Sequence, residues 1–319
     1  MWTAKAPANI ALIKYMGKKA HNIPRNVSLS YTLDKFYTEV SLELTSQCDK
    51  YVGKEPLNPE AKKRFVNHLK YIKKIYNCED FFAISSANHQ ILEDGSSGNF
   101  PHSAGIASSA SSFAALTMCT FEAMGDLMGV PIPPVEFQSS VSRIGSGSSC
   151  RSFFSPWCLW RDKKAEKISI KIDKLLTDLI IVDDQPKKIS SSKAHALVSS
   201  SLLMDGREKR AEIRLKNLLA ALNNGQWENA RQICWEEFWD MNALFETSFP
   251  SFGYTQPETI RILMEVRKFW QQNGDGPIAT MDAGPNVHLL WQLGQTDLRS
   301  FFFRNYVLGN FSCLSQSIA

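Results

Sequence analysis

A run of small residues that leads into an apolar helix constrains this 319-residue chain more than any other feature. Residues 101–112 read Pro-His-Ser-Ala-Gly-Ile-Ala-Ser-Ser-Ala-Ser-Ser and continue into Phe-Ala-Ala-Leu-Thr-Met-Cys. Gly105 permits a backbone turn that a Cβ would block, and the small residues after it let an anion approach the main chain. We expect Ser108 or Ser109 to cap the helix, and a phosphate to satisfy the N–H groups of its first turn. A nucleotide is therefore the first ligand to consider.

The same run has a second interpretation, because small residues before an alanine-rich helix also occur where a core helix packs tightly. Taken alone, the run leaves phosphate binding and core packing equally open. It is not a Walker loop, because that motif places Gly-Lys-Ser/Thr at the end of its glycine-rich turn and no lysine follows Gly105 here.

Length and composition limit the kind of protein. A chain of 319 residues is long for one hydrophobic core, so we expect two domains, and contents of 44% apolar and 21% charged residues are those of a globular protein. The net charge is only +4, and no basic stripe with interleaved aromatic residues occurs, so nucleic acid is not an expected partner. We expect the basic clusters 62–64 and 73–74 to lie on a solvated helix face.

The seven cysteines are odd in number and include no Cys-x-x-Cys pair, which argues against a disulfide framework or a zinc site. The N-terminal residues lack the charged and apolar blocks of a signal peptide, and no apolar run approaches membrane-spanning length. We expect a reduced, cytoplasmic protein without a membrane partner.

Periodicity predicts helices and strands in mixed order. Residues 36–44 alternate as in a half-buried strand, and Asn58-Pro59 predicts the start of a helix. The serine-rich segment 186–201 is expected to connect two halves. We therefore expect an α+β fold with domains 1–185 and 186–319. The other predicted elements are helices at 135–143, 213–222 and 257–272 and strands at 168–172, 179–182, 278–281 and 287–293.

Three further segments have compositions that packing alone explains poorly. Segment 6–18 reads as a strand that ends near Lys14 and Lys18, which by their residue type are expected at the surface. Segment 143–152 places two glycines and several hydroxyls between two arginines, which fits either a flexible polar loop or an anion site. Segment 280–286 presents an aspartate at a strand end, which is either an ordinary turn or a catalytic base.

Together the four segments resemble the mevalonate diphosphate decarboxylases of the GHMP kinase superfamily. The matching motifs are Asn-Ile-Ala-x-Ile-Lys-Tyr-x-Gly-Lys, Asn-Phe-Pro-x-x-Ala-Gly-x-Ala-Ser-Ser, Gly-Ser-Gly-Ser-x-Cys-Arg-Ser and Asp-Ala-Gly-Pro-Asn, and they span residue 6 to about residue 290. Residues 24–33 resemble a further family segment. The resemblance implies a two-domain GHMP kinase fold, with an N-terminal half like domain 2 of ribosomal protein S5 and a ferredoxin-like C-terminal half.

The resemblance also implies a reaction, in which ATP phosphorylates the 3-hydroxyl of mevalonate 5-diphosphate and loss of phosphate and carbon dioxide gives isopentenyl diphosphate for isoprenoid biosynthesis. Asp282 matches the catalytic aspartate that acts on the hydroxyl. Arg151 matches the arginine that holds the departing carboxylate, with Asn9 as its hydrogen-bonding companion. Ser109 matches a contact to the ATP phosphates and to Mg²⁺.

The remaining expected ligand contacts come from the same motifs. Lys18 is expected in both catalysis and substrate binding, Arg151 also binds substrate, and the resemblance implies a homodimer. The other substrate-binding residues that the resemblance implies are Tyr15, Ser146 and Ser148. The ATP-binding residues that it implies are Gly105, Ala107, Ser108 and Ser109.

Elementary electrostatics supports this interpretation. ATP, a diphosphate and a carboxylate repel one another strongly in a cleft of low dielectric constant. Helix N-termini, Lys18, Arg151 and Mg²⁺ would supply the opposing charge. Asp282 suits the role of base because none of the other motifs contains an aspartate or glutamate.

The sequence departs from the family pattern in several places. Met16 stands in place of a tryptophan, Ser155-Pro156 in place of Gly-Gly, and Asn242 where histidine is common. The family's serine-rich diphosphate stretch is only faintly visible in residues 190–201. A relative that acts on mevalonate 5-phosphate, as a decarboxylase or a 3-kinase, therefore stays open, as does a nucleotide-binding protein without catalysis.

Overall fold

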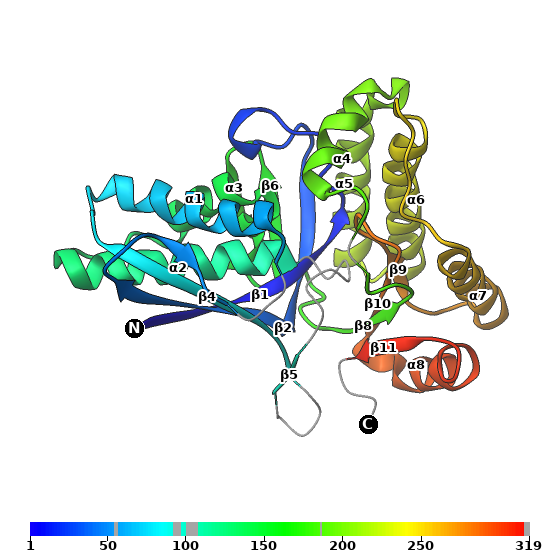
Figure 1. Cartoon of the computed structure of the whole chain (residues 1–319). Helices are drawn as coiled ribbons and strands as arrows, with labels where there is room; N and C mark the ends of the chain where they lie inside the picture. Colours follow the sequence, from blue (N-terminus) through cyan, green and yellow to red (C-terminus); the bar gives the residue numbers. More distant parts are fainter. Residues whose placement is uncertain (54–56, 92–96, 100–107, 186, 316–319) are drawn as a thin grey trace.

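The computed structural model describes residues 1–53, 57–91, 97–99, 108–185 and 187–315, with residues 97–99 and Ser315 described by their backbone alone. Helices pack against two separate sheets in the described part of the chain (Figure 1). A seven-stranded sheet is built by the N-terminal half, and a four-stranded sheet by the C-terminal half.

The first sheet is organised around one long strand, β2. Its neighbours run in the order β3-β4-β2-β6-β7, while β1 pairs with β2 and β5 with β4. All pairings are antiparallel except β3 with β4. The strand predicted at residues 36–44 is confirmed as part of β2. The strands are β1 (Trp2–Ile13), β2 (Ser28–Thr45), β3 (Lys50–Tyr51), β4 (Phe81–Ile91), β5 (Ser97–Asn99), β6 (Trp157–Arg161) and β7 (Lys164–Lys167).

Helices α1 (Pro59–Ile75), α2 (Ser108–Met128) and α3 (Val135–Gly145) lie along one face of this sheet (Figure 1). The predicted start of α1 is confirmed, because the Asn58 side chain accepts a hydrogen bond from the Ala61 N–H and Pro59 occupies the first helical position. Buried alanine and apolar side chains of α2 pack on β1 and β2.

The solvated face expected at the two basic clusters is wrong for two of their residues. Lys73 is buried and forms an ion pair with Asp49 at 2.8 Å. Arg64 turns toward α3, where its Nη2 donates to the Gly145 carbonyl at 3.0 Å and its guanidinium faces the Phe113 ring. Lys73 is buried and Arg64 half-buried, because distant segments supply an acceptor for each.

The second sheet comprises β8 (Leu175–Ile181), β9 (Ile278–Thr280), β10 (Val287–Gln292) and β11 (Ser312–Ser315) in the order β11-β8-β10-β9, all antiparallel. The predicted strands near 179–182, 278–281 and 287–293 are confirmed with small shifts. The strand predicted at residues 168–172 is wrong: the Lys171 N–H donates to the Asn223 side chain and the Ile172 carbonyl accepts from Trp157.

Helices of the C-terminal half pack around this sheet and against β1 (Figure 1). The predicted helices at 213–222 and 257–272 are confirmed, and Gly274 ends the latter with φ +65°. Part of the serine-rich connection is helical. These helices are α4 (Ser191–Leu197), α5 (Arg207–Asn223), α6 (Trp227–Glu246), α7 (Pro257–Asn273) and α8 (Thr296–Phe302).

One hydrophobic core joins the two halves. Leu12 of β1 and Leu29 of β2 belong to the same buried cluster as Leu215 and Leu218 of α5 and Ile278 of β9. The boundary after residue 185 stays a prediction, while β8, which precedes it, already pairs within the second sheet. This shared core fixes the end of β1 next to the loop that follows β9.

Within the described ranges, no helix has the length and apolar character needed to cross a membrane. All seven cysteines lie in these ranges, and none of them forms a disulfide.

Candidate active site

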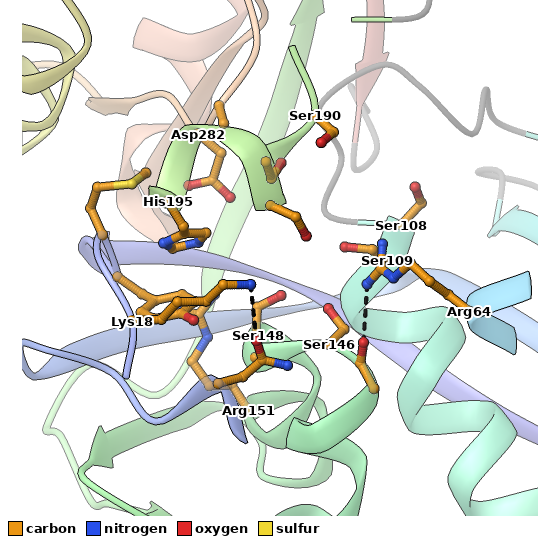
Figure 2. Close-up of a pocket in the computed structure, with 18 of the residues that line it drawn as sticks. Lys18, Arg64, Ser108, Ser109, Ser146, Ser148, Arg151, Ser190, His195 and Asp282 are labelled. Carbon is orange, nitrogen blue, oxygen red and sulfur yellow. Dashed lines mark hydrogen bonds between the residues drawn. The ribbon is translucent and has the colours of Figure 1, made fainter. Parts of the chain in front are cut away.

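A pocket of about 650 Å³ lies between the two halves, a volume suited to small-molecule ligands. The end of β1, the N-terminus of α2, the turn after α3, helix α4 and the β9–β10 turn all contribute to its wall. In the view of Figure 2, Asp282 and His195 lie across the pocket from Ser108, Ser109 and Arg64. The sequence-predicted residues that line it are Tyr15, Lys18, Ser108, Ser109, Ser146, Ser148, Arg151 and Asp282.

Asp282 follows β9 and meets the residue that ends β1. The Lys14 Nζ donates to the Asp282 carboxylate at 2.7 Å, and the side chains are 1% and 24% exposed respectively. The surface position expected for Lys14 is wrong, because Asp282 supplies the counter-charge that allows a lysine to be buried. The pair joins the two halves inside the pocket.

Hydrogen bonds fix both the backbone N–H and the carbonyl of Lys14. Its N–H donates to Glu237 Oε1 at 2.9 Å, and its carbonyl accepts from Arg207 Nη2 at 3.2 Å and from Asn26 Nδ2 at 2.7 Å. Arg207 and Glu237 are fully buried and ion-paired with each other. This pair between α5 and α6 therefore fixes the residue that orients Asp282.

The Asp282 carboxyl is held in its ionised form. Burial would raise its pKa, but the charge and hydrogen bond of Lys14, with the more distant charge of Arg151, hold the pKa below its ordinary value. Among the described residues that line the pocket, Asp282 is the single carboxylate. An ionised carboxylate in a cationic pocket can accept the proton of a substrate hydroxyl.

Arg151 is another charged residue of the pocket wall. It lies in a 3₁₀ segment, Gly147–Phe153, so the flexible loop considered from the sequence is wrong for these residues. Its Nε donates to Asn9 Oδ1 at 3.0 Å and its Nη1 to Ser28 Oγ at 2.6 Å. Arg151 is 3% exposed, and no carboxylate pairs with it in the described part of the chain.

Asn9 lies behind Arg151 rather than on the pocket wall. Its side chain is fully buried, and its Nδ2 donates to Ser152 Oγ at 2.8 Å. Asn9 therefore orients the guanidinium through Oδ1.

Tyr15, Lys18 and His195 form one side of the pocket. The Lys18 Nζ donates to Asn22 Oδ1 at 3.0 Å, and the Tyr15 ring contacts His195 with centroids 4.3 Å apart. A Cβ on Gly147 would lie 2.7 Å from the Tyr15 hydroxyl, so glycine allows the segment of Ser146 and Ser148 to approach Tyr15. His195 was missed from the sequence: the resemblance suggested a diphosphate-binding stretch at residues 190–201 but singled out no histidine in it.

The other side of the pocket is formed by α1 and the first turn of α2. Ser108 and Ser109 lie inside α2, so the expectation that one of them caps the helix is wrong; Ser108 already accepts hydrogen bonds from later serine hydroxyls at its carbonyl. Gly105 and Ala107 lie outside the described residues. Arg64 also lines the pocket. It was missed from the sequence because a hydrogen bond to the distant Gly145 carbonyl positions its side chain there.

Similarity to known proteins accords with this geometry. A model of the diphosphomevalonate decarboxylase-like N-terminal domain matches residues 6–171, and one of the mevalonate 5-diphosphate decarboxylase C-terminal domain matches residues 178–308. The chain belongs to the diphosphomevalonate decarboxylase family. The family expected from the sequence is therefore confirmed.

Individual relatives agree with this assignment. A mevalonate diphosphate decarboxylase structure from Legionella pneumophila is 46% identical with a TM-score of 0.91, covering 98% of this chain and 99% of its own. The MDDEF structure in complex with MVAPP, AMPPCP and magnesium is 28% identical with a TM-score of 0.84, covering 98% and 95%. The diphosphomevalonate decarboxylase of Saccharomyces cerevisiae is 29% identical, covering 96% of this chain and 81% of its own. The two-domain GHMP kinase-type fold is confirmed.

Proposed function

We propose that this chain is an ATP-dependent decarboxylase of mevalonate 5-diphosphate that serves isoprenoid biosynthesis. The observation that carries the proposal is that one cationic pocket contains both an ionised Asp282 and a buried Arg151 that has no carboxylate partner among the described residues. The substrate offers a hydroxyl to the first and a carboxylate to the second. The names of the relatives favour the diphosphate over the monophosphate as substrate.

The first step is transfer of the γ-phosphoryl group. Asp282 accepts the proton of the 3-hydroxyl, whose oxygen forms a bond to the γ-phosphorus while the bond to the departing ADP breaks. Lys14 fixes the carboxylate through the 2.7 Å ion pair, so that the oxygen facing the pocket keeps one direction. Lys18, Arg64 and Lys187 line the same pocket and would act as counter-charges to the phosphate groups.

The second step is the loss of phosphate and carbon dioxide. The C3–O bond breaks with its electrons leaving on phosphate, and the electrons of the bond to the carboxylate form the new double bond. Arg151 holds the carboxylate by its planar guanidinium until the carbon dioxide departs. Asn9 and Ser28 keep the guanidinium in place without neutralising it.

The donor groups of the pocket suit nucleotide and Mg²⁺. The N–H groups at the start of α2 and the hydroxyls of Ser108 and Ser109 match phosphate oxygens. Asp282, the single carboxylate among the described lining residues, and several hydroxyls suit a Mg²⁺ that would be held mainly by phosphate oxygens, with Ser109 as a protein ligand. When bound, Mg²⁺ neutralises charge on the transferred group.

The substrate-binding residues and the setting of the protein belong to the same proposal. Tyr15, Lys18, Ser146 and Ser148 bind the diphosphate, since they line the pocket beside Arg151. We propose a cytoplasmic homodimer, because the motif resemblance implies the dimer and seven cysteines without a disulfide suit a reducing compartment.

One assay tests the reaction. The purified chain is incubated with ATP, Mg²⁺ and either mevalonate 5-diphosphate or mevalonate 5-phosphate, and carbon dioxide and ADP are measured together. We expect equal amounts of both products from the diphosphate. ADP without carbon dioxide would contradict the decarboxylase, and a higher kcat/KM with the monophosphate would contradict the substrate.

A further inference from the structure

His195 presents one ring nitrogen to the pocket and has the other engaged. Nδ1 accepts a hydrogen bond from the Gly17 N–H at 3.1 Å. A backbone N–H can only donate, so Nδ1 carries no proton and the proton of the neutral ring lies on Nε2. No described group of the protein hydrogen-bonds Nε2, while the ring is part of the pocket wall (Figure 2).

The ring is fixed in position before any ligand arrives. It packs on Tyr15 with an interplanar angle of 39°, and it projects from α4, whose N-terminus is capped by the Ser190 side chain at the Lys193 N–H. Gly17 has φ +79°, which orients its N–H toward the ring at little conformational cost. Nε2–H is therefore a preorganised donor.

The surroundings keep this donor neutral. Burial, and then the charges of Lys18 and Arg151, lower the pKa of His195 to about 3. Protonation of Nδ1 would also place two donors against each other at Gly17. Asp282, which lines the same pocket, is already engaged by Lys14.

The three anionic or polar parts of the substrate divide among the pocket residues. Under the proposed function, Asp282 takes the hydroxyl and Arg151 the carboxylate, which leaves the diphosphate for the group formed by Tyr15, Lys18 and His195. The His195 ring contacts the Tyr15 ring, and the charge of Lys18 contributes to lowering the pKa of His195. A neutral donor completes such a site without adding another unpaired cation to it.

We propose that His195 donates a hydrogen bond from Nε2 to the substrate diphosphate and strengthens the preference for diphosphate over monophosphate. This inference rests on the proposed function for the identity of the ligand. A hydrogen bond to a charged group corresponds to about a 10- to 100-fold effect on binding.

Binding measurements test this without relying on turnover. Isothermal titration calorimetry compares isopentenyl diphosphate and isopentenyl phosphate on the wild type, His195→Phe and His195→Gln. The phenylalanine ring retains the packing on Tyr15 but has no donor, and the glutamine amide restores one. We expect Kd for the diphosphate to rise about 10- to 100-fold in His195→Phe and less than about fivefold in His195→Gln, with Kd for ATP changed less than twofold.

Controls separate the possible causes. His21→Asn, at an exposed position that has φ 57° and favours asparagine, is expected to bind like the wild type. An unchanged diphosphate Kd in a folded His195→Phe, or an equal rise for ATP, would overturn the inference. If the wild type releases no carbon dioxide but His195→Phe weakens diphosphate binding as expected, the proposed reaction fails and the role of His195 in diphosphate binding stands.

Nitrogen NMR on the histidine-labelled wild type tests the inference even where His195→Phe does not fold. We expect His195 to show a neutral ring with its proton on Nε2 at pH 7, and that proton to shift downfield when isopentenyl diphosphate is added. A doubly protonated ring, a proton on Nδ1, or an Nε2 proton unaffected by the ligand would overturn the inference.

Discussion

Two arginines, Arg151 and Arg207, are almost equally buried, at 3% and 0% exposed, yet their surroundings differ in charge. Arg207 contacts the carboxylates of Glu237 and Asp240. Arg151 donates to a neutral amide and a neutral hydroxyl. Burying a charge without a counter-charge is costly, so a protein retains such a residue where a ligand supplies the missing charge. We infer that the paired arginine stabilises the fold, and we propose that the unpaired one binds the substrate.

The two arginines are nevertheless linked through Lys14. Arg207 and Glu237 hold the main chain of Lys14, and its side chain orients Asp282 beside Arg151. The ion pair of Arg207 and Glu237 therefore supports the pocket that contains Arg151 and Asp282. We expect variants of Arg207 to change mainly stability, and variants of the pocket residues to change mainly catalysis.

The largest effect is expected where the pairing of Lys14 is broken. Asp282→Asn keeps the shape of the side chain but removes the base and leaves Lys14 without its counter-charge. We expect carbon dioxide release to fall by about 10³-fold or more, while ATP binding changes less than about threefold. Turnover at the wild-type rate would exclude Asp282 as the base.

The two arginines should separate in a stability measurement. Arg207→Met leaves Glu237 and Asp240 buried without this partner and is expected to lower the free energy of unfolding by about 3–5 kcal/mol. Arg151→Met removes a charge whose partners are neutral, and the change is expected to stay below about 1.5 kcal/mol. Urea denaturation of both variants measures the difference. An equal fall in the free energy of unfolding in both variants would contradict the claim that only the ion pairs of Arg207 stabilise the fold.

The pH profile tests the effect of Lys14 on Asp282. Lys14→Met removes the cation that lowers the Asp282 pKa, so burial raises the pKa and the carboxylate is protonated at higher pH. The acid limb of kcat/KM should move up by about one pH unit or more relative to the wild type. Lys18→Met is the matched control, since Lys18 is not paired with Asp282: its acid limb should stay in place while KM for the substrate rises. An acid limb that does not move in Lys14→Met would contradict the account.

The smallest effect is expected at the nucleotide end of the pocket. Ser109→Ala removes one hydroxyl from a site that also offers helix N–H groups and several cations. We expect KM for ATP to rise about 3- to 10-fold and KM for mevalonate 5-diphosphate less than twofold. Steady-state kinetics with each substrate varied in turn measures the two KM values. A rise only in KM for mevalonate 5-diphosphate would exclude Ser109 from the nucleotide site.

Local signals made much of the fold predictable. The start of α1 at Asn58-Pro59 and the end of α7 at Gly274 depend on neighbouring residues, so the sequence was sufficient for them. The strand pattern at residues 168–172 failed because side chains from elsewhere occupy the backbone groups that a sheet would need. The motifs placed Asp282 and Arg151, whose positions on the pocket wall follow from the family fold.

The rest of the site depends on partners far apart in the sequence. Lys14 and Asp282 are separated by 268 residues, and no local pattern announces that they form an ion pair. The same holds for Arg64 at the Gly145 carbonyl and for His195 at Gly17. Such residues become functional candidates only when the fold brings their distant partners next to them.

The unpaired charge of Arg151 is tested most directly by two ligands that differ in the carboxylate. Mevalonate 5-diphosphate carries this group, and isopentenyl diphosphate, the product, lacks it. Calorimetry on Arg151→Gln should show binding of the first weakened by about 30-fold or more and binding of the second changed less than about threefold. Equal weakening of both ligands, or of neither, would contradict the assignment of Arg151 to the carboxylate.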